Sequence, residues 1–401
     1  MPTPKENLNI PKDNKVILSL DGGGMRGILT LQLLKKLEQV AGAPCYEWCD
    51  LIAGTSTGAI ITGLILKGKT AIEIEKLYMQ LVTQVFTKRN MLSDRFLNPP
   101  KFDKSNYRTL LKKIVGDDTL EQACNKNQKK LDVLITSKDM AAGEETFFTC
   151  FQNNGVYKGT YKDVLLRAVM EATMSAPTYF VPYERFIDGG TTTFNNPVGA
   201  AVLEALCYSG KKNYQADKLT VFSFGTGTSL RFIAPDETRD PKGIDIKFWL
   251  NYVMDETGKD ASEMQVDMLR SGLIKGVDFR RYQISLDETS LGKIPDKDIT
   301  QLNHTQADRL RQLTNKELGC IDMADVTKFS LLQIIGEAMA EYVCPPSEQD
   351  LALAQQTGNW FRKDLLAPNK NRGDLVTSFG DTAQIAKNLK SFVWVDKQAT
   401  E

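Results

Sequence analysis

Two stretches of the chain decide the fold: VILSLDGGGMRG at residues 16–27 and LIAGTSTGAIITGLIL at residues 51–66. In each, a short apolar run typical of a buried strand enters a glycine-rich turn and then a segment with helical spacing, which after the first turn we expect from Ile28 to Val40. Further strand candidates lie at residues 131–137, 186–188 and 219–227. This alternation predicts an α/β fold with a mainly parallel sheet covered by helices.

The pattern along the chain predicts three parts. Residues 1–13 read as an N-terminal tail, and residues 14–245 carry the alternating strands and helices of the core. Residues 246–401 are mostly helical, a cap or subdomain, with one strand candidate at FRRYQISL (279–286). A chain of 401 residues with 42% hydrophobic residues is long enough to bury a sizeable core.

Composition narrows the classes of partner and cofactor. Fifty basic residues balance fifty acidic ones, so no overall field draws the protein to nucleic acid, and no nucleic-acid partner is expected. The N-terminus lacks the apolar run of a signal peptide, and no apolar stretch reaches transmembrane length, so a cytoplasmic protein is expected. Seven scattered cysteines favour reduced thiols, and Cys45 and Cys49 lack a second ligand pair. We expect neither metal nor cofactor.

The turn Gly54-Thr55-Ser56-Thr57-Gly58 fits the G-x-S-x-G nucleophile elbow and stands in the context this motif requires, with a strand before it and a helix after it. A serine at so sharp a turn has strained backbone, and Gly54 and Gly58 lack side chains, so the strand and helix can approach. The N–H groups at the helix start favour negative charge developing near the hydroxyl. Ser56 is therefore the candidate nucleophile.

The glycine loop at residues 21–27 allows two interpretations. Gly22, Gly24 and Gly27 satisfy the dinucleotide fingerprint G-x-G-x-x-G after a strand, which would indicate an oxidoreductase. That interpretation requires an acidic residue at the end of the next strand, where GTSTG stands instead. The favoured alternative is an oxyanion hole, in which the Gly23 and Gly24 amides stabilise a developing oxyanion and Arg26 anchors the loop or adds positive potential.

The scarcity of histidine restricts the choice of base. The chain has one histidine, His304, and the order Ser56, Asp188, His304 would match a Ser-Asp-His triad of the α/β-hydrolase type. On a helical projection, however, His304 lies about 200° from Leu302, on the polar side of its segment. This position favours a solvated surface histidine, so the base is expected to be a carboxylate.

Asp188 is the candidate base because it ends a short apolar strand in FIDGG, where Gly189 and Gly190 leave its side chain uncrowded. Carboxylates are weak bases in water, but burial beside a serine hydroxyl strengthens one and makes an intermediate imidazole unnecessary. Taken alone, most Asp-Gly-Gly sequences are turns or helix caps. Only its combination with the other two motifs points to chemistry.

These three motifs, DGGGMRG, GTSTG and DGG in that order, closely resemble those of the patatin-like phospholipases, which are also similar to the catalytic core of cytosolic phospholipase A2. The resemblance extends to SAPTYF (175–180), NNP (195–197) and FSFGTG (222–227). It implies a three-layer α/β/α core at residues 14–245 with a C-terminal helical extension. It also implies a Ser-Asp dyad at Ser56 and Asp188 and an oxyanion hole at the glycine loop (Gly22, Gly23, Gly24 and Arg26).

The resemblance further implies the reaction and the partners. The expected reaction is hydrolysis of fatty acyl esters of phospholipids or galactolipids through an acyl-serine intermediate, by a cytoplasmic protein acting peripherally at a membrane surface. Some bacterial relatives are membrane-degrading effectors in host interaction or phage defence, the latter activated by cyclic nucleotides, so the resemblance also allows an activating small ligand as a partner. A dinucleotide-binding oxidoreductase and a non-catalytic lipid-binding protein remain the alternatives.

Overall fold

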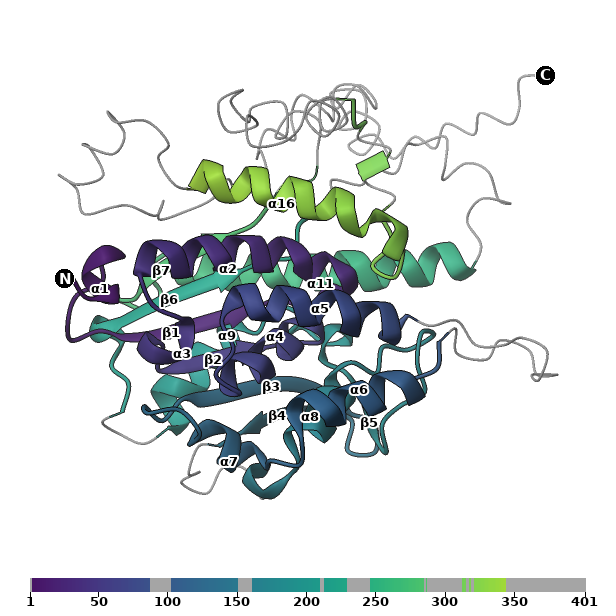
Figure 1. The fold of residues 1–401 in the computed structure, drawn as a ribbon, viewed down its shortest axis with the longest axis horizontal. Helices are drawn as coiled ribbons and strands as arrows, with labels where there is room; N and C mark the ends of the chain where they lie inside the picture. Colours follow the sequence, from purple (N-terminus) through teal and green to yellow (C-terminus); the bar gives the residue numbers. More distant parts are fainter. Residues whose placement is uncertain are drawn as a thin grey trace, which may run out of the picture.

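The computed structural model describes residues 2–86, 102–150, 161–209, 213–228, 246–284, 286, 312–314, 317–318 and 321–343. A central sheet runs through these residues, with helices on both faces (Figure 1). Its strands are β1 (Lys15–Leu20), β2 (Leu51–Gly54), β3 (Asp132–Asp139), β4 (Glu144–Thr149), β5 (Phe186–Asp188), β6 (Leu219–Phe224) and β7 (Asp278–Tyr282).

The sheet is mainly parallel, as predicted. Its order is β4-β3-β2-β1-β6-β7; the pairs from β3 to β7 are parallel, whereas β4 and β5 each pair antiparallel with β3. The predicted strands near residues 16, 51, 131, 186, 219 and 279 all form, and β4, which we did not predict, adds an antiparallel edge. The carboxyl ends of β1 and β2 therefore lie side by side, which brings the glycine loop next to the elbow.

Strand β1 shows why the centre of the sheet is hidden on both faces. Val16, Leu18 and Leu20 pack into one hydrophobic core, while Ile17 packs into a second core on the opposite face. Successive side chains of a strand point to opposite faces, so a continuous apolar run needs a helical layer on each side. The run VILSL therefore fits a central strand in a three-layer fold.

One face of the sheet is covered by the larger helical layer. Helix α4 packs on β2, α8 packs on β3 and on α4, and α16 packs along α2, as Figure 1 shows for the yellow-green and dark purple helices. The principal helices of this layer are α2 (Gly27–Ala41), α4 (Thr57–Leu66), α5 (Ala71–Val85), α6 (Ser105–Val115), α8 (Leu166–Thr173) and α16 (Phe329–Val343).

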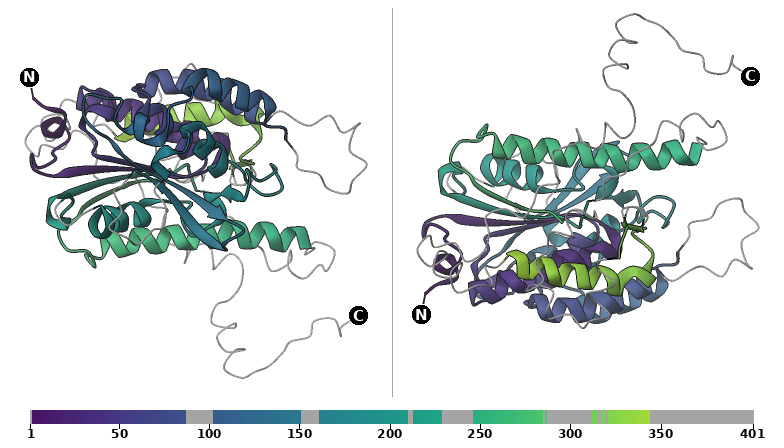
Figure 2. Two further views of the ribbon diagram at one scale, coloured as in Figure 1. Left: turned by 90° about the horizontal axis from the view of Figure 1, so that it is seen from below. Right: turned by 90° about the horizontal axis from the view of Figure 1, so that it is seen from above.

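The opposite face carries fewer helices. Helix α9 (Val198–Leu203) packs on β1 and β2, and the long helix α11 (Ile246–Arg270) packs on α9. Both views of Figure 2 show α11 on the far side of the sheet from α2, α5 and α16. The described residues thus form the α/β/α arrangement that the sequence predicts.

The chain beyond residue 245 also contributes to this arrangement. Strand β7 pairs with β6 and extends the sheet, and α16 packs on α2. The division at residue 245, with a cap or subdomain beyond it, remains a prediction, although these two elements lie directly against the core. Within the described residues, no helix combines the length and the apolar character needed to span a membrane.

Candidate active site

Ser56 lies at the sharp turn between β2 and α4, in a backbone conformation that few side-chain-bearing residues adopt (φ 52°, ψ −120°). The two elbow glycines permit this turn. A Cβ on Gly54 would lie 2.7 Å from the backbone nitrogen of Ala59, and one on Gly58 would overlap the carbonyl oxygen of Leu20. The structure therefore places Ser56, Gly54 and Gly58 in the strand, turn and helix that the motif predicts.

The hydroxyl of Ser56 is directed at Asp188. Ser56 Oγ donates a hydrogen bond of 2.7 Å to Asp188 Oδ2, and both side chains are buried, at 8% and 5% exposure. The second carboxylate oxygen, Oδ1, accepts a 2.7 Å hydrogen bond from the Gly190 amide. Residues 132 positions apart thus meet without an intervening side chain.

Burial makes the carboxylate of Asp188 more basic. Desolvation raises its pKa from 3.8 to about 6, while the hydrogen bonds from Ser56 and Gly190 partly oppose the rise. A carboxylate with such a pKa is a stronger base than an exposed one and is still mostly ionised at neutral pH. The arrangement can therefore accept a proton from the serine hydroxyl.

Residues at the end of α8 accept hydrogen bonds from the backbone of both Ser56 and Asp188. Thr173 Oγ1 accepts a 2.8 Å hydrogen bond from the Ser56 amide, and the Ser175 carbonyl accepts one of 3.1 Å from the Asp188 amide. Ser175 is in turn held by the buried Lys104, whose Nζ donates to its hydroxyl at 2.9 Å. One helix end thus fixes the backbone of both Ser56 and Asp188.

The glycine loop lies against the elbow, since a Cβ on Gly22 would come within 3.3 Å of the Cβ of Ser56. Its amides differ in availability. The Gly22 amide donates a 3.0 Å hydrogen bond to the Asn195 carbonyl, whereas the amides of Gly23 and Gly24 have no hydrogen-bond acceptor among the residues that the structure describes. The Gly22 donor is therefore occupied, and Gly23 and Gly24 retain donors that could bind an oxyanion.

Arg26 closes the loop through its backbone. It ends the short 3-10 turn η1 (Gly24–Arg26), and its amide donates to the Gly23 carbonyl at 3.1 Å. Gly24, with φ 58°, approaches the backbone of Met323 so closely that a Cβ there would overlap the Met323 carbonyl oxygen. That same oxygen accepts a 2.8 Å hydrogen bond from the Met25 amide.

The structure describes some of the residues on which the alternative interpretations depend. At the end of β2, where a dinucleotide site needs a ribose-binding acid, stand Thr55 and Ser56. His304 lies outside the described residues. Within the described part of the chain, no cluster of three or more His, Cys, Asp or Glu residues could hold a metal ion.

Three side chains that hold the glycine loop were not identified from the sequence. Thr226 donates to the Gly22 carbonyl at 2.8 Å, Tyr78 donates to the Gly24 carbonyl at 2.6 Å, and Arg281 forms an ion pair with Asp21. Thr226 and Tyr78 stand in no motif with an assigned role. Arg281 did carry a signal, because two consecutive arginines inside an apolar strand are almost never buried without partners.

The sequence of this region matches a known family. Residues 18–202 match the family model described as Patatin-like phospholipase. This stretch of the chain is thus similar to a patatin-like phospholipase domain. The match includes the glycine loop, Ser56 and Asp188, and it ends within α9. Thr226 and Arg281, which hold the loop of this patatin-like domain, lie beyond the matched residues.

Curated relatives agree with this similarity. The chain is 27% identical over 259 residues to the cGAMP-activated phospholipase of Escherichia coli (strain TW11681), a match covering 61% of this chain and 69% of the relative. It is 30% identical to the cGAMP-activated phospholipase of Vibrio cholerae serotype O1 (49% and 59% covered) and to Patatin-like protein 2 of Oryza sativa subsp. indica (46% and 49%). For the latter two, the match spans less than two thirds of the relative.

Proposed function

We propose that this protein is a lipid acyl hydrolase of the phospholipase A type, with Ser56 as the nucleophile and Asp188 as the base. The observation that carries the proposal is the 2.7 Å hydrogen bond from Ser56 Oγ to Asp188 Oδ2 at a strained, buried elbow. The match of residues 18–202 to the patatin-like phospholipase model supports a fatty acyl ester of a membrane phospholipid or galactolipid as the substrate.

In the proposed acylation step, Ser56 Oγ attacks the ester carbonyl carbon while Asp188 takes the hydroxyl proton. The carbonyl oxygen becomes an oxyanion, to which the amides of Gly23 and Gly24 donate, with Arg26 adding positive potential to the loop. The ester C–O bond then breaks, and Asp188 returns the proton to the leaving lyso-lipid oxygen. The products of this step are an acyl-serine and a lyso-lipid.

In the proposed deacylation step, Asp188 removes a proton from water, and the resulting hydroxide attacks the acyl carbon. The second tetrahedral oxyanion collapses, the fatty acid departs, and the proton returns to Ser56 Oγ. The same carboxylate thus acts alternately as base and acid, which its raised pKa suits. Neither step calls for a histidine.

The setting of this reaction is also part of the proposal. Its substrate lies in a membrane surface, so the protein would act peripherally there, from the cytoplasm. The Escherichia coli and Vibrio cholerae relatives are named cGAMP-activated phospholipases, which supports testing a cyclic dinucleotide as an activating ligand. The proposal also includes a membrane-degrading role in phage defence or host interaction.

One labelling experiment tests the proposed chemistry. A fluorophosphonate probe should add its mass to the full chain at Ser56 and should not label S56A, because only an activated serine reacts with it. The same proteins are assayed for fatty acid release from phospholipid vesicles, with and without cGAMP. An unlabelled protein that binds NAD would favour the dinucleotide-binding alternative, and vesicle binding without label or turnover would favour a lipid-binding protein.

A further inference from the structure

Asp21, the first residue of the glycine loop, is a buried carboxylate at 4% exposure. It follows β1 directly and precedes Gly22, so the position of its backbone sets where the loop begins. Its amide is fixed by a 3.0 Å hydrogen bond to the carbonyl of Phe224 on β6. Burial raises the pKa of Asp21, and Arg281 opposes that rise. A carboxylate here therefore depends on a compensating cation.

Arg281 on β7 supplies this cation. Its Nη1 donates to Asp21 Oδ1 at 3.0 Å and its Nη2 to Asp21 Oδ2 at 2.6 Å, and its side chain is only 5% exposed. Two parallel N–H bonds of this kind fix the orientation of a carboxylate as well as its charge. The ion pair joins residues 260 positions apart.

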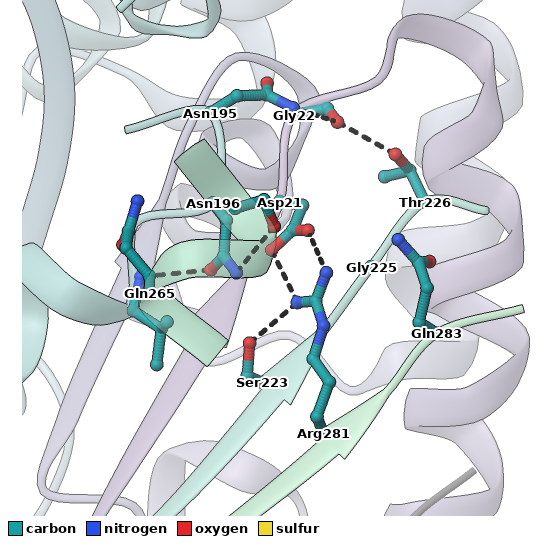
Figure 3. Close-up of polar contacts among 12 residues, drawn as sticks. Asp21, Gly22, Asn195, Asn196, Ser223, Gly225, Thr226, Gln265, Arg281 and Gln283 are labelled. Atoms are coloured by element: carbon teal, nitrogen blue, oxygen red, sulfur yellow. Dashed lines mark hydrogen bonds and ion pairs between the residues drawn. The ribbon is translucent and has the colours of Figure 1, made fainter. Parts of the chain in front are cut away.

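The guanidinium reaches Asp21 across the intervening strand β6. Ser223 is the register partner of both Ser19 on β1 and Arg281 on β7, and its hydroxyl accepts a 2.7 Å hydrogen bond from Arg281 Nη1. Figure 3 shows the Arg281 side chain between Ser223 and Asp21, with Thr226 directed at Gly22 nearby. The guanidinium group of Arg281 is thus bound by Ser223 on β6 as well as by Asp21 at the start of the loop.

We propose that Arg281 is a positioning residue for the oxyanion-binding amides of Gly23 and Gly24, acting through Asp21. This inference rests on the proposed function and deepens it. Arg281 fixes the start of the loop and neutralises the carboxylate beside it. Without Arg281, the loop would lose its anchor, and an unpaired negative charge would lie two residues from Gly23, whose amide is proposed to bind the oxyanion.

The neighbouring Arg280 provides a matched control. It lies on the same strand and is fully buried, but it bonds to the carbonyls of Leu8 and Asn9 and to Asp278, away from the glycine loop. Successive residues of a strand face opposite sides of the sheet, so the two arginines are both buried but have different partners. Substituting Arg280 reports the general cost of removing a buried arginine from β7.

The test compares R281M and R281K with R280M in the full chain, by turnover of a p-nitrophenyl ester and by melting temperature. We expect all three variants to melt at lower temperature. R281M should lower kcat about 100-fold, with KM nearly unchanged. The displaced amides would no longer stabilise the oxyanion of the transition state, whereas binding of the uncharged ester depends little on them. R281K, which keeps the charge but not the fork, should be intermediate, and R280M should keep kcat within about threefold of the wild type.

A trifluoromethyl ketone separates positioning from partial unfolding. This inhibitor forms a tetrahedral oxyanion with an active-site serine, so its inhibition constant should rise in R281M by about the factor that kcat/KM falls. Unfolding of a fraction of the molecules would lower the rate and leave that constant unchanged. The double variant D21N/R281M, which removes both charges, should recover about tenfold of the rate lost in R281M.

The outcomes distinguish this inference from the proposed function. If the wild type is active but R281K and D21N/R281M match R280M in kcat and in inhibitor affinity, positioning by Arg281 is wrong and the Ser56 chemistry stands. These two variants decide the matter even if R281M does not fold. A wild type that neither takes up the fluorophosphonate nor releases fatty acid overturns the proposed function, and the role of Arg281 with it.

Discussion

In the half of the site that carries Ser56 and Asp188, the sharp turn is shaped by neighbours in sequence, whereas the glycine loop beside it is held by residues from distant parts of the chain. Gly54 and Gly58 shape the elbow from two positions away on either side. The loop is held instead by side chains on other elements, among them Thr226 and Arg281, and by the backbone of Met323. The turn that presents the nucleophile is thus a local feature, while orientation of the amides is a property of the whole fold.

The largest expected effect lies in the half that carries the reacting groups. D188N should lower turnover by at least about 10⁴-fold, because an amide cannot accept the Ser56 proton although it keeps the shape of the carboxylate. The measurement is fatty acid release from vesicles at saturating substrate. D139N is the control, because Asp139 ends β3 beside β5 but bonds to Arg185 rather than to Ser56. Comparable rates in D188N and D139N would rule out Asp188 as the base.

The glycine loop should be the next most sensitive. In G23A the new methyl group would lie 2.6 Å from the Cβ of Thr226, so the loop must shift and its amides with it. Loss of aligned oxyanion donors costs about 10²- to 10³-fold in kcat. G258A in α11 is the control, because a Cβ there meets open space and alanine stabilises a helix by about 0.5–1 kcal/mol. Full turnover in a folded G23A protein would contradict this role for the loop.

The same contrast explains how much could be predicted from the sequence. Six of the seven strands and the elbow follow local rules, namely apolar runs and glycines at a fixed spacing. Asp188 could be singled out only by its place after a short strand together with the other two motifs. Arg281 and Tyr78 act by contact across the fold, and neither spacing nor residue type identifies their partners. Strand β4 was missed for a related reason, since its pairing with β3 rather than a long apolar run establishes EETFFT as a strand.

A smaller effect, graded with pH, should follow from the burial of Asp188. Its pKa is raised to about 6, so the ionised base is lost as pH falls through that value. Turnover of a soluble ester should be half-maximal near pH 6 and should fall about tenfold for each pH unit below it. Rates that stay level from about pH 7 to about pH 5 would exclude a base with this pKa.

The same pKa predicts a change in stability. Because the folded-state pKa lies above the ordinary 3.8, the folded protein holds this proton more tightly than the unfolded chain. The free energy of unfolding should therefore fall as pH rises from about 4 to about 6, by about 3 kcal/mol. The side-chain amide in D188N does not titrate, so this loss of stability is confined to the wild type. The melting temperature of D188N minus that of the wild type should therefore increase as pH rises across the same interval.

The smallest expected effect comes from one hydrogen bond to the glycine loop, and two buried tyrosines isolate it. Tyr78 and Tyr107 are both fully buried, and burial raises the pKa of each hydroxyl. The Tyr78 hydroxyl donates to the Gly24 carbonyl, whereas that of Tyr107 has no partner within the described part of the chain. Y78F and Y107F therefore remove the same atom from equally buried sites, one bonded to the loop and one not.

Y78F should lower the free energy of unfolding by about 1 kcal/mol and kcat by about three- to tenfold, with KM unchanged. The loss is small because the Gly24 carbonyl still accepts the Gly27 amide. Y107F should keep full turnover and be equally or more stable, since it removes a buried hydroxyl that has no described partner. Denaturant unfolding measures the stability of the two variants, and ester hydrolysis measures their turnover. If the two variants lose the same turnover, the Tyr78 hydroxyl does not orient the loop, and the remaining contacts from Thr226 and Arg281 suffice to hold it.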